Sequence, residues 1–135
     1  MGIAERRGAA DFRTNNYPTL AQQIAKLVGY EVGIEVDWET IAFEGKGTRY
    51  AELWTKLYFT PVIEALQQIA SDPVGRDALR QGVKKIVFTN TRGAYSPTSA
   101  ITFDAGVIAI DHSDSNIDDV QPRTQHLVKL LEARL

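Results

Sequence analysis

A glycine-containing turn at Glu44–Arg49 has residue types that could bind an anion. Its candidate ligands are Gly45, Lys46, Gly47 and Thr48. Free N–H groups at a helix N-terminus favour phosphate or sulfate, and Lys46 would add positive charge. The turn departs from a nucleotide-binding P-loop, because Thr40 stands where that loop needs its first glycine and Gly47 where it needs Ser or Thr. A plain turn with Thr48 as helix cap explains the same residues, and we favour it over an anion site.

The stretch from Asp111 to Asp119 carries carboxylates that could bind a hard cation such as Ca²⁺. In a loop starting at Asp114, however, Asp119 stands where an EF-hand requires glycine, and Gln125 stands where it requires glutamate. Ser, Asn and Asp side chains before a helix also cap its free N–H groups and complement its dipole. We therefore interpret the stretch as a capping segment and predict no metal and no cofactor.

His112 follows Asp111, so a general base oriented by a carboxylate is chemically conceivable. The chain has no cysteine and only one other histidine, and it has no Gly-x-Ser-x-Gly motif for a serine nucleophile. These absences favour a non-catalytic protein. They leave open a small enzyme or small-molecule binder, whose pocket would lie between the long helix and the sheet, lined by Trp54, Tyr58 and His112.

Acidic and apolar residues alternate along residues 32–39. The apolar positions Val32, Ile34, Val36 and Trp38 fall between Gly33, Glu35, Asp37 and Glu39. A period of two is typical of a half-buried strand with one apolar face and one solvent face. Thr89 and Thr91 on a neighbouring predicted strand would extend the polar face. We expect this acidic sheet surface to be the place where a partner binds.

Helical and strand periodicities predict the elements that position these residues. Helices are predicted at residues 17–28, 50–69, 73–82 and 120–135, and strands at residues 32–39, 84–91, 98–103 and 107–111. Pro61 interrupts the long helix, so we expect a kink or a restart there with Thr60 as cap. Asp72 is the predicted cap of the short helix. Asp104, Ala105 and Gly106 are expected to form a three-residue hairpin loop.

The order α-β-α-α-β-β-β-α indicates an α+β fold. We expect a mostly antiparallel sheet of about four strands, with helices covering one face. The last three strands would form a meander. Residues 1–16 lack apolar periodicity and are expected to be a flexible N-terminal arm, followed by one domain at residues 17–135.

The composition of the chain excludes several classes of protein. The chain has 135 residues, 44% hydrophobic residues and a formal net charge of −2. It lacks the apolar run of about 18 residues that a membrane span needs and the apolar stretch of a secretory signal, so we expect a cytoplasmic location without membrane contact. The near-balanced charge argues against a nucleic-acid surface.

Together these observations favour a non-catalytic module that binds another protein, in the manner of an adaptor, a chaperone or an inhibitor. The candidate binding residues are Glu35, Asp37, Glu39, Thr89, Thr91, Trp54, Tyr58 and His112. Edge strands of a small sheet can also pair across a two-fold axis, so a homodimer is compatible with this fold.

Overall fold

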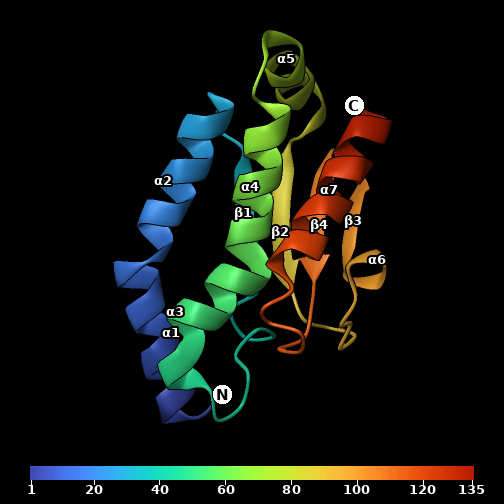
Figure 1. Cartoon of the computed structure of the whole chain (residues 1–135). Coiled ribbons are helices and arrows are strands. Elements are labelled where there is room, and N and C mark those ends of the chain that lie inside the picture. Colours follow the sequence, from blue (N-terminus) through green and yellow to red (C-terminus); the bar gives the residue numbers. More distant parts are fainter.

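The computed structural model describes residues 1–135 and has two layers, a four-stranded sheet and a set of helices that covers one of its faces (Figure 1). The strands are β1 (Gly33–Val36), β2 (Lys85–Thr89), β3 (Ile101–Asp104) and β4 (Val107–Asp111). The helices are α1 (Ile3–Asn15), α2 (Tyr17–Val28), α3 (Tyr50–Trp54), α4 (Thr60–Ile69), α5 (Pro73–Gly82), α6 (Pro97–Ala100) and α7 (Val120–Arg134).

The sheet is mixed, which corrects the expectation of a mostly antiparallel sheet. Its order is β1-β2-β4-β3; β1 pairs in parallel with β2, β2 pairs in parallel with β4, and only β3 and β4 are antiparallel. The last three strands do alternate in direction. They do not form a meander, because the β3–β4 hairpin inserts β4 beside β2 and leaves β3 at the edge.

Residue composition explains this strand order. The sequence Val107-Ile108-Ala109-Ile110 is apolar on both faces, which suits a central strand. In β3, Ile101 and Phe103 are buried while Thr102 and Asp104 are exposed, which suits an edge. Strand β1 forms the opposite edge and also alternates between exposed and half-buried residues.

The core lies between the sheet and helices α2, α4 and α7, which run side by side across the same face (Figure 1). Alternate strand residues enter this core, including Ile86, Phe88, Ile108 and Ile110, all of which are fully buried. The opposite side chains of each strand remain half-exposed or exposed. We call this second side the helix-free face of the sheet.

Helix α1 stands where the sequence predicted a flexible arm. Phe12 is buried and its ring lies 5.1 Å from that of Trp54. Gly8 lies directly against the Gly47 backbone, since a Cβ atom on Gly8 would lie 2.1 Å from the Gly47 carbonyl oxygen. Contacts made through a glycine and a single aromatic residue leave no apolar period in the sequence, which is why the helix was not predicted.

A π-helical segment, Thr55–Phe59, joins α3 to α4 just before Pro61. The wider π turn accommodates a proline that would clash with an ordinary preceding turn. Thr60 therefore continues the helix and does not cap a new one, contrary to expectation. The predicted cap of α5 is confirmed, because the Asp72 carboxylate accepts a hydrogen bond from the Gly75 amide at 2.7 Å.

The β3–β4 hairpin has a two-residue loop, shorter than the expected three. Ala105 and Gly106 both adopt positive φ values, 50° and 79°. This pattern is that of a type I′ turn, whose twist matches the flanking strands. Residues 98–100, predicted as the start of a strand, belong to helix α6.

Candidate functional site

Four carboxylates lie exposed along and beside strand β1. We call Glu31, Glu35, Asp37 and Glu39 the acidic row. Odd-numbered residues of this segment hydrogen-bond toward β2, as shown by the Gly33 and Asp37 amides donating to Lys84 and Phe88 carbonyls. Within the strand, the Glu35 side chain therefore lies on the helix-free face, as the sequence period predicted; Glu31 precedes the strand, and Asp37 and Glu39 follow it.

One cation forms an ion pair with the acidic row. The Lys85 ammonium lies 3.2 Å from the Glu35 carboxylate, with 40% and 62% of the two side chains exposed. An exposed pair of this kind contributes about 0–1 kcal/mol and leaves both groups accessible to a partner. The remaining three carboxylates are unpaired with any Lys or Arg. This edge of the sheet therefore carries a local excess of negative charge.

The helix-free face continues from the acidic row with small side chains. Glu35 is in register with Val87, Val87 with Ala109, and Ala109 with Thr102. Thr89 and Asp111 lie in the adjacent register position. Valine, alanine and threonine side chains make this a shallow surface, suited to contact with another flat surface and not to enclosing a small molecule.

Thr91 lies just past β2 and is tied to Asp111. The Asp111 carboxylate accepts hydrogen bonds from the Thr91 amide, the Thr91 hydroxyl and the Arg92 guanidinium. Burial acts to raise the pKa of Asp111, but these hydrogen bonds outweigh it and hold the pKa below its usual value. Thr91 therefore helps to hold the loop after β2 against the end of β4.

Trp54, Tyr58 and His112 belong to the core, although the sequence placed them among the binding candidates. All three have no exposed surface. The Trp54 indole donates to the Ile41 carbonyl at 2.8 Å, and the Tyr58 hydroxyl donates to the His112 carbonyl at 2.6 Å. Burial raises the pKa of Tyr58, with Asp111 and Asp114 acting in the same direction. None of these side chains can contact a partner in this fold.

His112 is held in the core with a single ring partner. Its Nδ1 lies 2.6 Å from the Ser113 carbonyl oxygen, and its Nε2 has no hydrogen-bond partner. Burial is the main cause that lowers the pKa of His112, and the Arg123 guanidinium adds to it. A carboxylate-oriented general base is not what the geometry shows, since the Asp111 carboxylate bonds to Thr91 and Arg92.

The buried His112 predicts an acid-sensitive fold. Its pKa in the folded chain lies below the unfolded value of 6.5, so the unfolded state binds the proton first. The free energy of unfolding should therefore fall as the pH drops below about 6.5. The midpoint temperature of thermal unfolding should fall as the pH is lowered from 8 to 5 in the native chain and in His126→Gln. It should fall less steeply in His112→Gln. Equal slopes in the native chain and His112→Gln would contradict this assignment.

Arg123 is a buried charged residue that the sequence analysis did not single out. It is 1% exposed, and its guanidinium donates to the carbonyls of Lys56, Asn116 and Ile117 at 2.7–3.1 Å. These bonds fasten the loop after β4 to the helix layer. An arginine in the first turns of an amphipathic helix gives no sequence signal that distinguishes this role from a solvent-exposed one.

The carboxylates of the Asp111–Asp119 stretch are directed to separate partners. Asp114 pairs with Lys46 and Asp118 pairs with Lys56. No group of three or more His, Asp or Glu side chains lies close enough to hold a metal ion. The stretch is thus held by individual ion pairs and by Arg123.

Two of the candidate anion donors in the Glu44–Arg49 turn are occupied within the chain. The Gly45 amide donates to the Glu5 carboxylate at 3.2 Å, and Lys46 pairs with Asp114. Gly47 is buried against α1. Thr48 makes no side-chain cap for the short 3₁₀ helix Gly47–Arg49. The carboxylate of Glu5 thus occupies the place where an external anion would bind.

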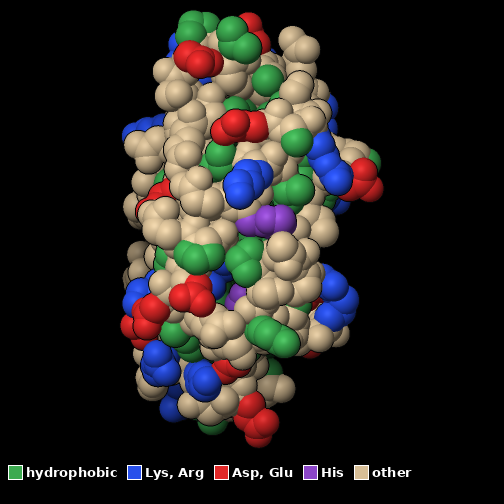
Figure 2. All heavy atoms as spheres, turned by 45° about the vertical axis from the view of Figure 1, so that its right-hand side comes forward, with side chains coloured by type: hydrophobic (Ala, Val, Ile, Leu, Met, Phe, Trp, Pro, Cys, Tyr) green, Lys and Arg blue, Asp and Glu red, His purple; other side chains and the backbone are tan.

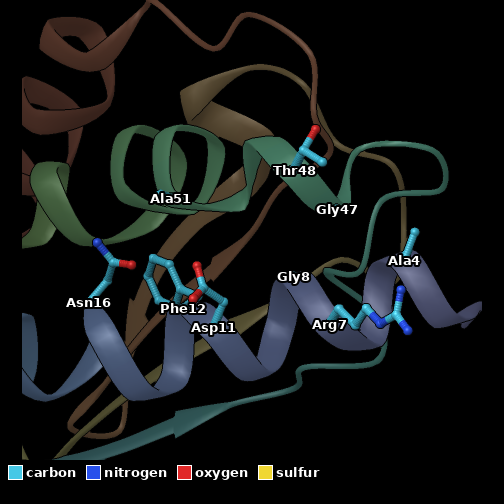
Figure 3. Close-up of a pocket in the computed structure, with 9 residues that line it drawn as sticks. All are labelled: Ala4, Arg7, Gly8, Asp11, Phe12, Asn16, Gly47, Thr48 and Ala51. Atoms are coloured by element: carbon cyan, nitrogen blue, oxygen red, sulfur yellow. The ribbon is translucent and has the colours of Figure 1, made fainter.

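A cavity of about 370 Å³ lies between α1 and the start of α3 (Figure 3). Its polar side chains do not converge: Asn16 and Asp11 rise from α1, Arg7 lies beside Ala4 at the far end, and the Thr48 hydroxyl points away from α1. A specific small-molecule site needs polar groups that meet at one point. This cavity lacks that arrangement.

On the face over α7 and β3, basic and acidic side chains are interspersed (Figure 2). No charge of one sign gathers there, in contrast to the acidic row at β1. No helix in the structure has both the length and the apolar character needed to cross a membrane.

Comparison of the chain with protein-family models, with curated proteins and with solved structures finds no match.

Proposed function

We propose that this chain is a non-catalytic cytoplasmic module that binds another protein through the acidic row and the adjoining helix-free face. The observation that carries the proposal is the row of exposed carboxylates on the edge strand β1 and in the segments beside it, next to a sheet surface that no helix covers. Charge on an exposed surface guides association and selects partners of opposite sign. A protein with a basic surface is the partner that fits this row.

Two further features support a binding role over catalysis. The histidine and aromatic side chains that could have done chemistry are buried in the core and bonded to backbone carbonyls. The polar groups around the cavity beside α1 do not converge. The alternative that the sequence left open, a small-molecule binder or small enzyme with a pocket between the long helix and the sheet, has less support, because Trp54, Tyr58 and His112 have no exposed surface.

Charge reversal of the acidic row tests the proposal. The triple variant Glu35→Lys, Asp37→Lys, Glu39→Lys should lose the protein that the tagged native chain captures from its own cell extract. These side chains are exposed, so thermal unfolding should change little; Asp37 gives up a hydrogen bond with the Thr40 amide.

The matched control reverses three exposed carboxylates away from β1: Glu44→Lys, Asp77→Lys and Glu132→Lys. Both triple variants have the same net charge, so nonspecific electrostatic effects cancel in the comparison. Capture should persist in the control. Equal capture by both variants, or equal loss in both, would contradict the acidic row as the interface.

A further inference from the structure

The outer edge of strand β1 has unpaired backbone groups. Gly33 and Asp37 donate their amides to β2, and backbone groups alternate in direction along a strand. The N–H and C=O groups of Ile34 and Val36 therefore point away from β2. No strand lies on that side, because β1 is the end of the sheet order. An unpaired edge is a template for one more strand.

The opposite edge of the sheet is less available. There the Phe103 carbonyl of β3 accepts a hydrogen bond from the Arg134 guanidinium of α7. The C-terminal helix thus occupies a backbone acceptor of β3, and no side chain does so for Ile34 or Val36. Of the two edges, β1 is the one prepared for an added strand.

A groove follows the β1 edge on the helix side. A cavity of about 410 Å³ lies between α2 and β1, lined by the apolar side chains of Tyr17, Ala21, Ala25, Val32 and Ile34 together with Gly33 and Glu31. Ala21 and Ala25 are one helical turn apart, so the same face of α2 presents two small side chains to the strand. The groove has room for apolar side chains of a strand paired to Ile34.

The two faces of an added strand would meet different surroundings. Residues placed opposite Ile34 and Val36 would face the apolar groove, and residues placed opposite Gly33, Glu35 and Asp37 would face the acidic row. The row has one paired cation, Lys85, for its four carboxylates. A segment complementary to the β1 edge would therefore alternate apolar residues with Lys or Arg.

A second copy of this chain is a poor occupant of the same edge. Pairing β1 with β1 across a two-fold axis would bring two acidic rows onto one face, and like charges opposite each other destabilise a strand pair. The charge pattern selects a different chain with a basic strand.

We propose that β1 binds an extended segment of a partner protein by strand addition, with alternating basic and apolar residues, the basic ones on the acidic row and the apolar ones in the α2–β1 groove. This inference rests on the proposed function and names the partner's chemistry. Main-chain hydrogen bonds would supply affinity, and the groove and the carboxylates would supply specificity.

A defined peptide tests the proposal on the full chain. The probe is fluorescein-labelled Lys-Val-Lys-Val-Lys-Val-Lys, and fluorescence anisotropy measures its binding. The peptide should bind the native chain, with affinity that falls as salt is added. A peptide of the same composition with its three valines adjacent should bind at least about tenfold more weakly. Equal binding of the two peptides would show that charge alone is recognised and would overturn strand addition.

Backbone methylation isolates the edge hydrogen bonds. One version of the probe carries N-methyl groups on its valines and another carries them on its lysines, so charge and side chains are the same. In an added strand only one of these two sets of N–H groups faces β1. One methylated peptide should lose binding while the other retains it. Equal affinities of the two would overturn the proposal.

Filling the groove tests the helix side. Ala21→Leu with Ala25→Leu should weaken peptide binding about tenfold, while the control Ala10→Leu on the exposed surface of α1 should not. Thermal unfolding of each variant identifies any loss of fold. If Ala21→Leu with Ala25→Leu unfolds, Ala25→Ser provides the milder test, with the same direction expected. Unchanged peptide affinity in folded groove variants would overturn the groove's role.

The two proposals fail in different ways. If the peptide does not bind while the captured native partner is still lost on reversal of Glu35, Asp37 and Glu39, then strand addition is wrong and the acidic interface stands. If reversal leaves both the partner and the peptide bound, the proposed function itself is wrong.

Discussion

Replacing Arg123 by methionine is expected to lower the free energy of unfolding by about 3 kcal/mol, because buried carbonyls left without their donor cost about 1–3 kcal/mol each while the cost of burying a charge is removed. The guanidinium is 1% exposed and donates to three carbonyls, from Lys56, Asn116 and Ile117. Methionine fills a similar volume but removes the guanidinium donor from all three carbonyls, of which that of Asn116 keeps the Asp119 amide as a donor. Urea denaturation at pH 7 measures the loss.

Two comparisons make the result specific to the guanidinium. Arg123→Lys keeps a positive charge but lacks the planar fork that reaches several carbonyls, so it should give a loss between those of the native chain and Arg123→Met. Lys129→Met changes an exposed residue on the same helix and should stay within about 0.5 kcal/mol of the native chain. An Arg123→Met variant as stable as Lys129→Met would contradict the role given to Arg123.

Gly8→Ala is expected to destabilise the chain by about 1–3 kcal/mol, the usual cost of overpacking. A Cβ atom at Gly8 would lie 2.1 Å from the Gly47 carbonyl oxygen, so α1 must move away from the Glu44–Arg49 turn. The direction of the stability change shows whether α1 is packed against the turn. In a helix that packs against nothing, glycine to alanine stabilises by about 1 kcal/mol.

The exposed position Ala10 on the same helix calibrates this sign. Ala10→Gly should destabilise by up to about 1 kcal/mol through helix propensity alone. Urea denaturation of the two variants compares the two effects directly. A Gly8→Ala variant that gains the stability lost by Ala10→Gly would show that α1 does not pack on the turn, and the flexible arm expected from the sequence would then describe residues 1–16 better.

The sequence predicted well those helices and strands whose bounds are set by local side-chain periodicity and by caps. The helix at residues 17–28, the Asp72 cap and the strand at residues 107–111 are found with the expected bounds. Helix α7 begins at the predicted residue and ends one residue early. The strand predicted at 32–39 is shorter, because the chain turns after Val36.

Strand order could not be predicted, because it depends on contacts between distant segments. The turn at Ala105-Gly106 indicated that β3 and β4 pair, and the apolar residues on both faces of β4 favour an inner position, but neither feature shows which strand β4 lies beside. The burial of β4 on one face and the half-burial of its other face decide this, and they follow from packing in three dimensions. The same limit applies to α1, whose contact with Gly47 is tertiary.

In the candidate site, too, the sequence predicted what depends on local pattern and missed what depends on tertiary packing. Alternation along residues 32–39 correctly indicated that Glu35, Asp37 and Glu39 are exposed, although only Glu35 lies in β1. Helical spacing of Trp54 and Tyr58 is equally consistent with a pocket wall and with a core, and the structure places them in the core. The α2–β1 groove arises from Ala21 and Ala25, which in the sequence are ordinary helix formers.

Amide hydrogen exchange, measured on the chain alone and on its complex with the protein captured from native extract, shows whether the partner covers the β1 edge. Binding should slow exchange across residues 31–40, above all at Ile34 and Val36, whose amides point away from β2. Protection confined to α1 or α7, with β1 exchanging at the same rate in both samples, would contradict it.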